Sequence, residues 1–214
     1  GGNNVIKDNS TSYATIVGGR INTTDEAEYA FVGGGAANTI SAGQYNFIGS
    51  GSGSVITASN FSIIVGGRSN HISGVDYATT IVGGIDNTIS GSQYSFIGGG
   101  NQNTMHTNGG HNFIGGGYQH SICGEDSTIV GGRYHSITGV DGFIGGGRLH
   151  HISGIGSSVV GGEVHNISAI YSAIGGGWKG NIETGNYSTI AGGYTNSLSS
   201  GSGFGFIGGG NTNI

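Results

Sequence analysis

The chain has 214 residues, of which 50 are glycine and none is proline, and its formal net charge is −5. This composition excludes collagen, which needs proline as well as glycine at every third position, and the many Ile, Val, Tyr and Phe side chains argue against a disordered segment. The mild negative charge gives no electrostatic footprint for nucleic acid or an anionic membrane. No apolar run reaches the roughly 18 residues that a membrane-spanning helix needs, and the single cysteine, Cys123, cannot form a disulfide within the chain. We therefore expect an ordered protein with no nucleic-acid partner and no membrane insertion.

One motif recurs along the whole chain: a hydrophobic residue, two glycines, two variable residues, Asn, another variable residue, Ile, Ser and Gly, returning every 15 to 17 residues. Repeats of this length build a fold by stacking on their neighbours. No other segment interrupts the series, so we expect residues 1–214 to form a single continuous repeat domain without capping units. The motif cores begin, in chain order, at Thr15, Phe31, Phe47, Ile63, Thr80, Phe96, Phe113, Thr128, Phe143, Ser158, Ala173, Thr189 and Phe206.

Two columns of apolar residues run through these repeats, the second eight residues after the first. Several glycines in each repeat disfavour a helix, because each costs about 1 kcal/mol relative to alanine, whereas short β-branched runs bounded by Gly and Asn are typical of strands and turns. If each repeat forms one coil, isoleucines stack on isoleucines between parallel strands. The sequence therefore predicts an all-β fold, a parallel β-solenoid of about 13 turns. Its predicted core holds Ile16, Ile48, Ile64, Ile81, Ile97, Ile114, Ile129, Ile144, Ile72, Ile89, Ile122, Ile137, Ile152, Ile167 and Ile182.

A polar column precedes the second apolar column by two residues and hence faces the same side of the strand. Stacked Asn side chains can hydrogen-bond to one another and to the backbone of the turns. We expect such a ladder from Asn22, Asn38, Asn70, Asn87, Asn103, Asn196 and Asn213. A further column of aromatic residues predicts stacked rings along one edge of the solenoid: Tyr13, Tyr29, Tyr45, Phe61, Tyr94, Tyr171, Tyr187 and Phe204.

The polar column continues as four histidines, His120, His135, His150 and His165. Successive rings would lie about 4.8 Å apart, and a metal ion could bridge two of them. The alternative is that His replaces Asn in a structural ladder. We favour the structural ladder, because no carboxylate or cysteine column accompanies the histidines, and we expect neither a metal nor a cofactor. Stacked imidazoles should resist protonation, which predicts a loss of stability below about pH 6.

Around the first apolar column the two flanking positions change size together. Where the preceding residue is Phe, the following residue is Gly; where it is Thr, Ser or Ile, the following residue is Val, and only the repeats at Ala173 and Thr189 depart from this. Flanking residues share the strand face opposite the core, and compensating volumes matter only where packing is tight. Either another chain or a second layer of the same chain covers this face, or each exposed Phe only shields a neighbouring Gly. We favour another chain, because the sequence contains no spare element to form a second layer. The first interpretation predicts an assembly face of Phe31, Phe47, Phe96, Phe113, Phe143, Phe206, Val17, Val65, Val82, Val130 and Val160.

Two segments, STIVGGRYHSITG at residues 127–139 and YSFIGGGNQNTM at residues 94–105, carry a likeness to a known family. They resemble the head-type β-roll repeats of trimeric autotransporter adhesins and similar repeats in phage and viral tail fibres. The resemblance covers nearly the whole chain, although the period is longer than the adhesin turn and no coiled-coil neck follows. It implies three chains wound as parallel β-rolls around a shared axis, in an extracellular location on a cell or virion surface.

An enzymatic function is not expected. Catalysis by a solenoid needs paired carboxylates in a groove, often with inserted loops, and the repeat length varies too little to supply such loops. Glu26 with Glu28 and Glu125 with Asp126 are acidic pairs that do not recur along the chain. No Asp column supports a calcium-binding repeat, and no catalytic residue is assigned.

The sequence instead predicts a structural or adhesive fibre segment, a rigid shaft or filament subunit whose partner is the chain itself, as a trimer or an end-to-end polymer. The alternative is a solenoid surface that binds a cell-surface glycan or ice. Ice binding would need a regular Thr column, whereas Thr occurs only intermittently. Because the chain begins and stops inside a repeat, we expect it to be cut from a longer fibre or to continue end to end in a polymer. Glycan binding would use outward aromatic residues, and the candidates near the corners are Tyr118, Tyr134, Trp178 and Tyr194.

Overall fold

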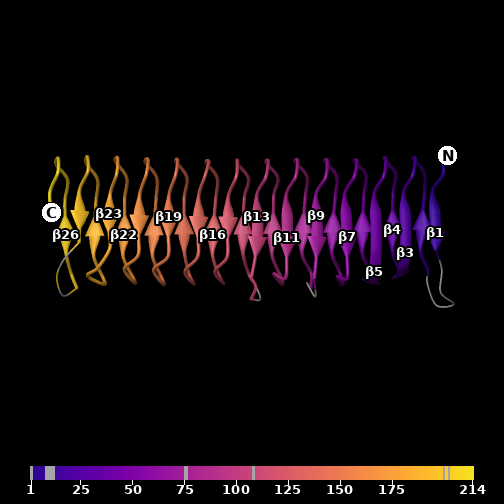
Figure 1. Ribbon diagram of the computed structural model, residues 1–214, viewed down its shortest axis with the longest axis horizontal. Coiled ribbons are helices and arrows are strands. Elements are labelled where there is room, and N and C mark those ends of the chain that lie inside the picture. Colours follow the sequence, from indigo (N-terminus) through magenta and orange to yellow (C-terminus); the bar gives the residue numbers. More distant parts are fainter. Residues whose placement is uncertain (1, 8–12, 75–76, 108, 200, 202) are drawn as a thin grey trace. The chain divides into compact units, whose positions relative to one another are not determined.

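The computed structural model describes residues 2–7, 13–74, 77–107, 109–199, 201 and 203–214. These residues form short β-strands joined by tight corners, and they contain no helix that is long and apolar enough to cross a membrane. Strands of successive coils pair in parallel (Figure 1). The predicted all-β parallel β-solenoid is confirmed. It has about twelve turns, where the sequence predicted about 13.

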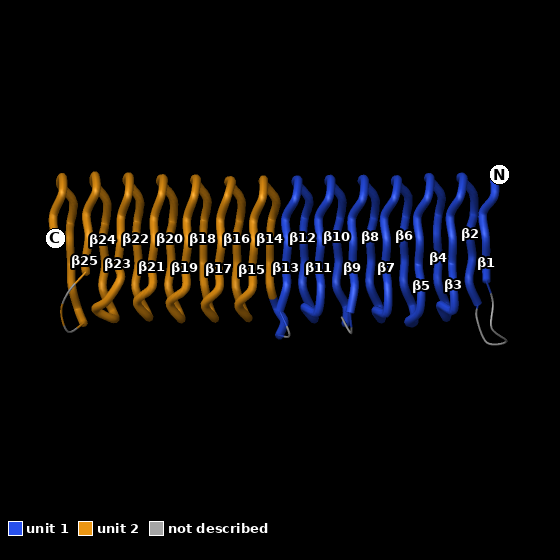
Figure 2. The backbone as a smooth tube through the Cα atoms, in the orientation of Figure 1, with its two compact units in different colours: residues 1–111 blue, residues 112–214 orange. Residues whose placement is uncertain are grey.

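The chain divides into two compact units, unit 1 over residues 1–111 and unit 2 over residues 112–214 (Figure 2). In each unit the odd-numbered strands form one sheet and the even-numbered strands form the other. The odd-numbered strands of unit 1 are β1 (Val5–Lys7), β3 (Thr23–Glu28), β5 (Thr39–Gln44), β7 (Val55–Thr57), β9 (His71–Ser73), β11 (Thr88–Ser90) and β13 (Thr104–His106). Its even-numbered strands are β2 (Thr15–Ile16), β4 (Phe31–Val32), β6 (Phe47–Ile48), β8 (Ile63–Ile64), β10 (Thr80–Ile81) and β12 (Phe96–Ile97).

Unit 2 repeats this arrangement with shorter odd-numbered strands. Its odd-numbered strands are β15 (Ser121–Ile122), β17 (Ser136–Ile137), β19 (His151–Ile152), β21 (Asn166–Ile167), β23 (Asn181–Ile182) and β25 (Ser197–Leu198). Its even-numbered strands are β14 (Phe113–Ile114), β16 (Thr128–Ile129), β18 (Phe143–Ile144), β20 (Ser158–Val159), β22 (Ala173–Ile174), β24 (Thr189–Ile190) and β26 (Phe206–Ile207).

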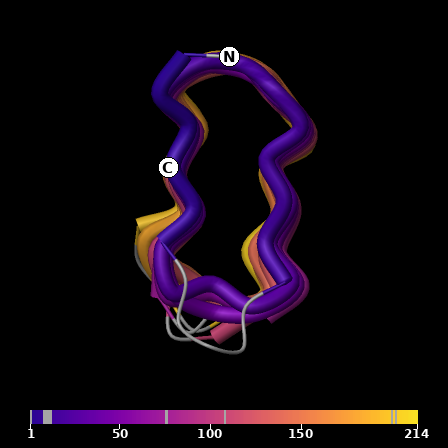
Figure 3. The backbone as a smooth tube through the Cα atoms, turned by 90° about the vertical axis from the view of Figure 1, so that its right-hand side faces the viewer, coloured from indigo at the N-terminus to yellow at the C-terminus, as the bar shows by residue number. Residues whose placement is uncertain are grey.

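Seen end-on, a coil is a flattened loop with two long sides (Figure 3). Within each unit, one long side belongs to the odd-numbered sheet and the other to the even-numbered sheet, and the apolar columns fill the space between them. The register stacks like on like: Ile40 pairs with Ile56, and Ile129 pairs with Ile144. All predicted core isoleucines are fully buried except Ile16, which is half-buried because β2 has a strand neighbour, β4, on only one side.

Each coil has two corners. The glycine corner follows an even-numbered strand and contains the Gly pair, whereas the far corner follows an odd-numbered strand. The buried residues on either side of the glycine corner are always eight positions apart, as Ile129 and Ile137 are. Across the far corner the separation ranges from seven, between Ile137 and Ile144, to nine, between Met105 and Ile114. The variation in repeat length is therefore confined to the far corner.

The glycine corner requires glycine at the second position of its Gly pair. Gly19 has a φ of +86°, and a Cβ there would lie 2.1 Å from the carbonyl oxygen of Gly35 in the next coil. In unit 2, Gly132 has a φ of +98°, and its Cβ would lie 2.5 Å from the carbonyl oxygen of Gly147. A side chain would meet both a strained backbone and the neighbouring coil, which explains why this glycine recurs in every repeat.

Candidate assembly face and polar ladders

The residues that flank the buried position of each even-numbered strand form an outward surface, which we name the uncharged face. In both units these positions carry only Phe, Ile, Thr, Ser, Ala, Val and Gly. The predicted valines are exposed, from 41% for Val82 to 67% for Val17. Of the predicted phenylalanines, two are half-buried and four are exposed. The half-buried pair is Phe31 and Phe96, and the exposed ones are Phe47, Phe113, Phe143 and Phe206.

Phenylalanines of the uncharged face lie over the glycine two residues later. Cε1 of Phe47 is 3.1 Å from the point where a Cβ of Gly49 would stand, and that Cβ would also come within 2.5 Å of the carbonyl oxygen of Val65 in the next coil. For Phe113 and Gly115 the ring lies 3.3 Å from the same point. The pairing of Phe with Gly is thus accounted for within one chain. This is the shielding alternative, so the size pattern alone does not require a second chain.

The outward surface of the odd-numbered strands is different in chemistry. Thr88 and Ser90 flank the buried residue of β11, and Ser136 and Thr138 flank that of β17. Hydroxyl, amide and imidazole groups dominate this side of the coil. Each coil is therefore amphipathic, with a polar flat face and an apolar one.

The Asn ladder lines the inside of the glycine corner. Nδ2 of Asn38 donates to the carbonyl oxygen of Gly34 in its own coil at 3.0 Å and to that of Gly51 in the next coil at 3.1 Å, while Oδ1 accepts the N–H of Ser54 at 3.0 Å. One side chain thus satisfies three backbone groups of a tight corner. A bond between Asn side chains, the other kind that we expected, joins Asn213 to Asn196. The fully buried members are Asn22, Asn38, Asn70, Asn87, Asn103 and Asn196, and Asn213 is exposed.

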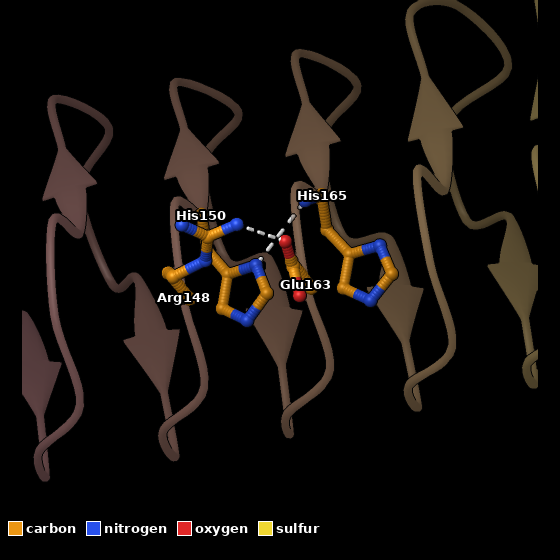
Figure 4. Close-up of polar contacts among 4 residues, drawn as sticks. All are labelled: Arg148, His150, Glu163 and His165. Atoms are coloured by element: carbon orange, nitrogen blue, oxygen red, sulfur yellow. Dashed lines mark hydrogen bonds and ion pairs between the residues drawn. The ribbon is translucent and has the colours of Figure 1, made fainter.

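The His ladder takes the same position in unit 2. Its four imidazoles are buried and stack face to face, with ring centroids 4.9 Å apart for His120 and His135, 4.7 Å for His135 and His150, and 4.8 Å for His150 and His165. Nδ1 of His150 accepts the backbone N–H of His165 at 3.2 Å (Figure 4). In unit 1, Oδ1 of an Asn rung accepts the equivalent backbone N–H group. Because Nδ1 is an acceptor, the neutral ring carries its proton on Nε2.

Burial makes these rings resist protonation. It lowers the pKa of His120 to about 4, of His135 to about 3 and of His150 to about 4, and it also lowers the pKa of His165. The neighbouring rings lower the pKa of His135 further, because a like charge disfavours the charged form. The carbonyl groups of glycines in the same corner and the Glu163 carboxylate beside His150 act in the opposite direction with smaller effect. The ladder is therefore uncharged at neutral pH.

The arrangement of the His ladder serves the backbone. Parallel stacked rings do not direct their nitrogens toward a common point, as a metal ion requires, and the Nδ1 atoms are engaged by backbone N–H groups. Within the ranges that the structure describes, no group of three or more His, Cys, Asp or Glu side chains could hold a metal ion. The four histidines thus act as rungs, as Asn does in unit 1.

A second inward ladder, which we did not anticipate, lies inside the far corner. The Oγ of Ser157 accepts the N–H of Ser172 at 3.1 Å, and the Oγ of Ser172 accepts that of Ser188 at 3.1 Å. In unit 1, Oδ1 of Asn46 accepts the N–H of Ser62 at 3.0 Å. The sequence signal was available, because these residues precede a buried residue by two positions, as the Asn and His rungs do. The two halves of a coil therefore use the same device.

Aromatic residues at the corners stack on one another. Tyr29 and Tyr45 have ring centroids 4.7 Å apart and an interplanar angle of 1°, and Trp178 and Tyr194 lie 4.5 Å apart at 15°. Nζ of Lys179 stands 4.3 Å from the Trp178 ring centroid. One face of each of these four rings is thus covered within the chain. Tyr118 and Tyr134 differ, meeting edge to face at 5.4 Å.

No protein-family model and no curated protein matches this sequence.

Proposed function

We propose that this chain is a structural fibre segment, a rigid shaft or filament subunit, in which copies associate through the uncharged face. The observation that carries the proposal is the contrast between the two flat sides of the coil. One side carries hydroxyl, amide and imidazole groups, whereas the other exposes Val and Phe with no charged residue in either flanking column. Exposed apolar surface of this extent is typical of an interaction site, and sheets that stay apart in solution usually carry charges.

Two further features support a rigid shaft. Each buried polar rung ties its own coil to the next through backbone groups, as Asn38 does, so that bending would break hydrogen bonds in a dry interior. Variation in coil length is limited to the far corner, which leaves the uncharged face regular. Three chains that turn their uncharged faces toward a shared axis would give the trimer that the adhesin and tail-fibre resemblance implies. The same resemblance supports an extracellular or virion-surface location.

The alternative of a glycan-binding or ice-binding surface has less support. Sugars stack on the faces of aromatic rings, but Trp178 and Tyr194 cover one another and Lys179 covers Trp178. On the polar face, columns of Thr and Ser are interrupted by residues such as His71 and His151. We therefore place self-association before ligand binding.

The test is the molar mass and shape of the purified chain, by light scattering and electron microscopy, at about 500 mM NaCl, where exposed charges are screened. We expect oligomeric rods. The double variant Val82→Lys, Val130→Lys should be a folded monomer, because both side chains are already exposed in the single chain. The control is Thr138→Lys, which places a lysine on the polar face of unit 2, close in sequence to Val130. This variant should remain oligomeric. A monomeric parent, or an oligomeric Val82→Lys, Val130→Lys variant, would refute the proposal.

A further inference from the structure

The glycine corner of unit 2 has an unusual composition. The outward position after its Gly pair is occupied in successive stacked coils by Tyr118, Arg133, Arg148, Glu163, Trp178, Tyr194 and Asn211. Arg, Trp and Tyr are the residue types that are enriched in the energetically important parts of protein–protein interfaces. The corresponding positions of unit 1 hold, besides two arginines, Gly2, Ala36, Ser52, Ile85 and Asn101. This concentration is therefore not demanded by the fold of the corner.

The same corner collects the positive charge of unit 2. Its three cationic residues, Arg133, Arg148 and Lys179, all lie there, and Glu163 is the one acidic residue beside them, which leaves a net charge of 3 − 1 = +2. Arg148 forms an ion pair with Glu163 (Figure 4). Arg133 is exposed, and no carboxylate of the described residues pairs with it. The corner thus presents cationic groups to solvent.

The far corner of unit 2 is acidic. Glu125, Asp126 and Asp141 are exposed there, and the described residues of this corner include no Lys or Arg, so its net charge is −3. The chain climbs continuously through the coils, and Arg133 follows Asp126 and precedes Asp141. Along the axis on which the coils stack, at about 4.8 Å per coil, Arg133 therefore lies between Asp126 and Asp141. These two carboxylates are on the opposite edge of the unit. The two edges of unit 2 are therefore opposite in charge, and their charged residues are matched in position along the stacking axis.

We propose that the glycine corner of unit 2 binds the acidic far corner of unit 2 in a second, parallel copy of this chain. Such copies lie side by side, with Arg133 opposite Asp126 and Asp141 of the neighbour and the exposed aromatic residues beside them. Because two different edges meet, the contact is heterologous and can add copies without closing. This contact gives lateral association of shafts, which is separate from packing through the uncharged face and does not depend on it.

The experiment is a charge-reversal complementation, read by sedimentation velocity at about 20 mM and about 500 mM NaCl. The parent chain should gain mass at low salt over its state at high salt. Arg133→Glu with Arg148→Glu, and separately Asp126→Lys with Asp141→Lys, should each weaken this low-salt association about tenfold. Lysine is compatible with the left-handed backbone of Asp126 and Asp141, since Lys179 itself has a φ of 52°. Mixing the two variants should restore association, because each acidic edge then meets a cationic one.

Lys7→Glu combined with Thr138→Glu, which adds negative charge on the odd-numbered strands away from both corners, is the control and should associate as the parent does. Unchanged low-salt association in either reversed variant, or a mixture that fails to associate, would overturn the inference. Failure of the proposed function has a separate signature, namely a monomeric parent chain at high salt. Recovery in the mixture also shows that both variants are folded.

Discussion

The Asn rungs of unit 1 and the His rungs of unit 2 occupy the same position in the coil but differ in chemistry. Both supply an acceptor for a backbone N–H of the next coil, through Oδ1 of Asn38 and Nδ1 of His150. The Asn amide also donates to two glycine carbonyl groups. The imidazole instead gains face-to-face stacking, and it can be protonated. The backbone N–H of the next coil is thus bound by Asn rungs in unit 1, which do not titrate. In unit 2 it is bound by His rungs, which can be protonated.

The largest expected effect is that of acid, which should lower the stability of unit 2 more than that of unit 1. A histidine in the unfolded chain has a pKa near 6.5, whereas that of His135 in the fold is about 3. Between these pH values the unfolded chain binds protons that the folded ladder does not. The free energy of unfolding of unit 2 is therefore highest above about pH 6.5 and falls with decreasing pH, by up to about 1.4 kcal/mol per pH unit for each ladder histidine.

Denaturant unfolding at about pH 7 and pH 4.5, with hydrogen exchange to locate the loss, measures this effect. The loss should be larger in unit 2 than in unit 1, where burial also lowers the pKa of His71. The matched variant replaces His120, His135, His150 and His165 by Asn, and its stability should change little over this pH range. Equal acid sensitivity of the parent and the variant would show that the ladder is not the cause.

Removing one rung of the Asn ladder should have the next largest effect. Asn87 makes three hydrogen bonds, to the carbonyl groups of Gly83 and Gly100 and from the N–H of Asn103. Asn87→Ala leaves these buried groups without partners, and we expect a loss of about 2–3 kcal/mol in the free energy of unfolding. Thr88→Ala, on the outward side of the same strand, should lose less than about 0.5 kcal/mol in the same denaturant titration. A loss as small for Asn87→Ala would contradict the role of the rung.

The smallest expected effect comes from completing the ladder. Ser54 accepts no rung bond, and among the described residues its buried Oγ has no hydrogen-bond partner. Ser54→Asn should stabilise unit 1 by about 1 kcal/mol, because an amide at this position can accept the N–H of Asn70 and donate to the carbonyl of Gly67. An increase in the urea midpoint at an unchanged slope would establish this gain. A lower midpoint would mean that the longer side chain is not accommodated.

Much of the fold could be predicted, because a repeat multiplies every weak signal. The two isoleucine columns identified the strands and the core, and an offset of two residues placed Asn and His inside. Ile16 was wrongly assigned to the fully buried core, since a periodic pattern carries no information on which coil lacks a neighbour. The second ladder was missed because Ser157 and Ser172 resemble ordinary corner residues when hydrogen bonds are not visible.

The sequence by itself determined the all-β class, the parallel stacking and the side of the strand on which each column lies, because side-chain direction alternates strictly along a strand. Only the tertiary structure decided what the outward columns do. The size exchange between Phe and Gly favoured a covering chain when only volumes were known. In the folded coil the Phe47 ring lies on Gly49, and a Cβ added at that glycine would lie 2.5 Å from the carbonyl oxygen of Val65 in the next coil. The volume of a side chain follows from the sequence alone, whereas the direction in which a ring points depends on its rotamer and on the neighbouring coil.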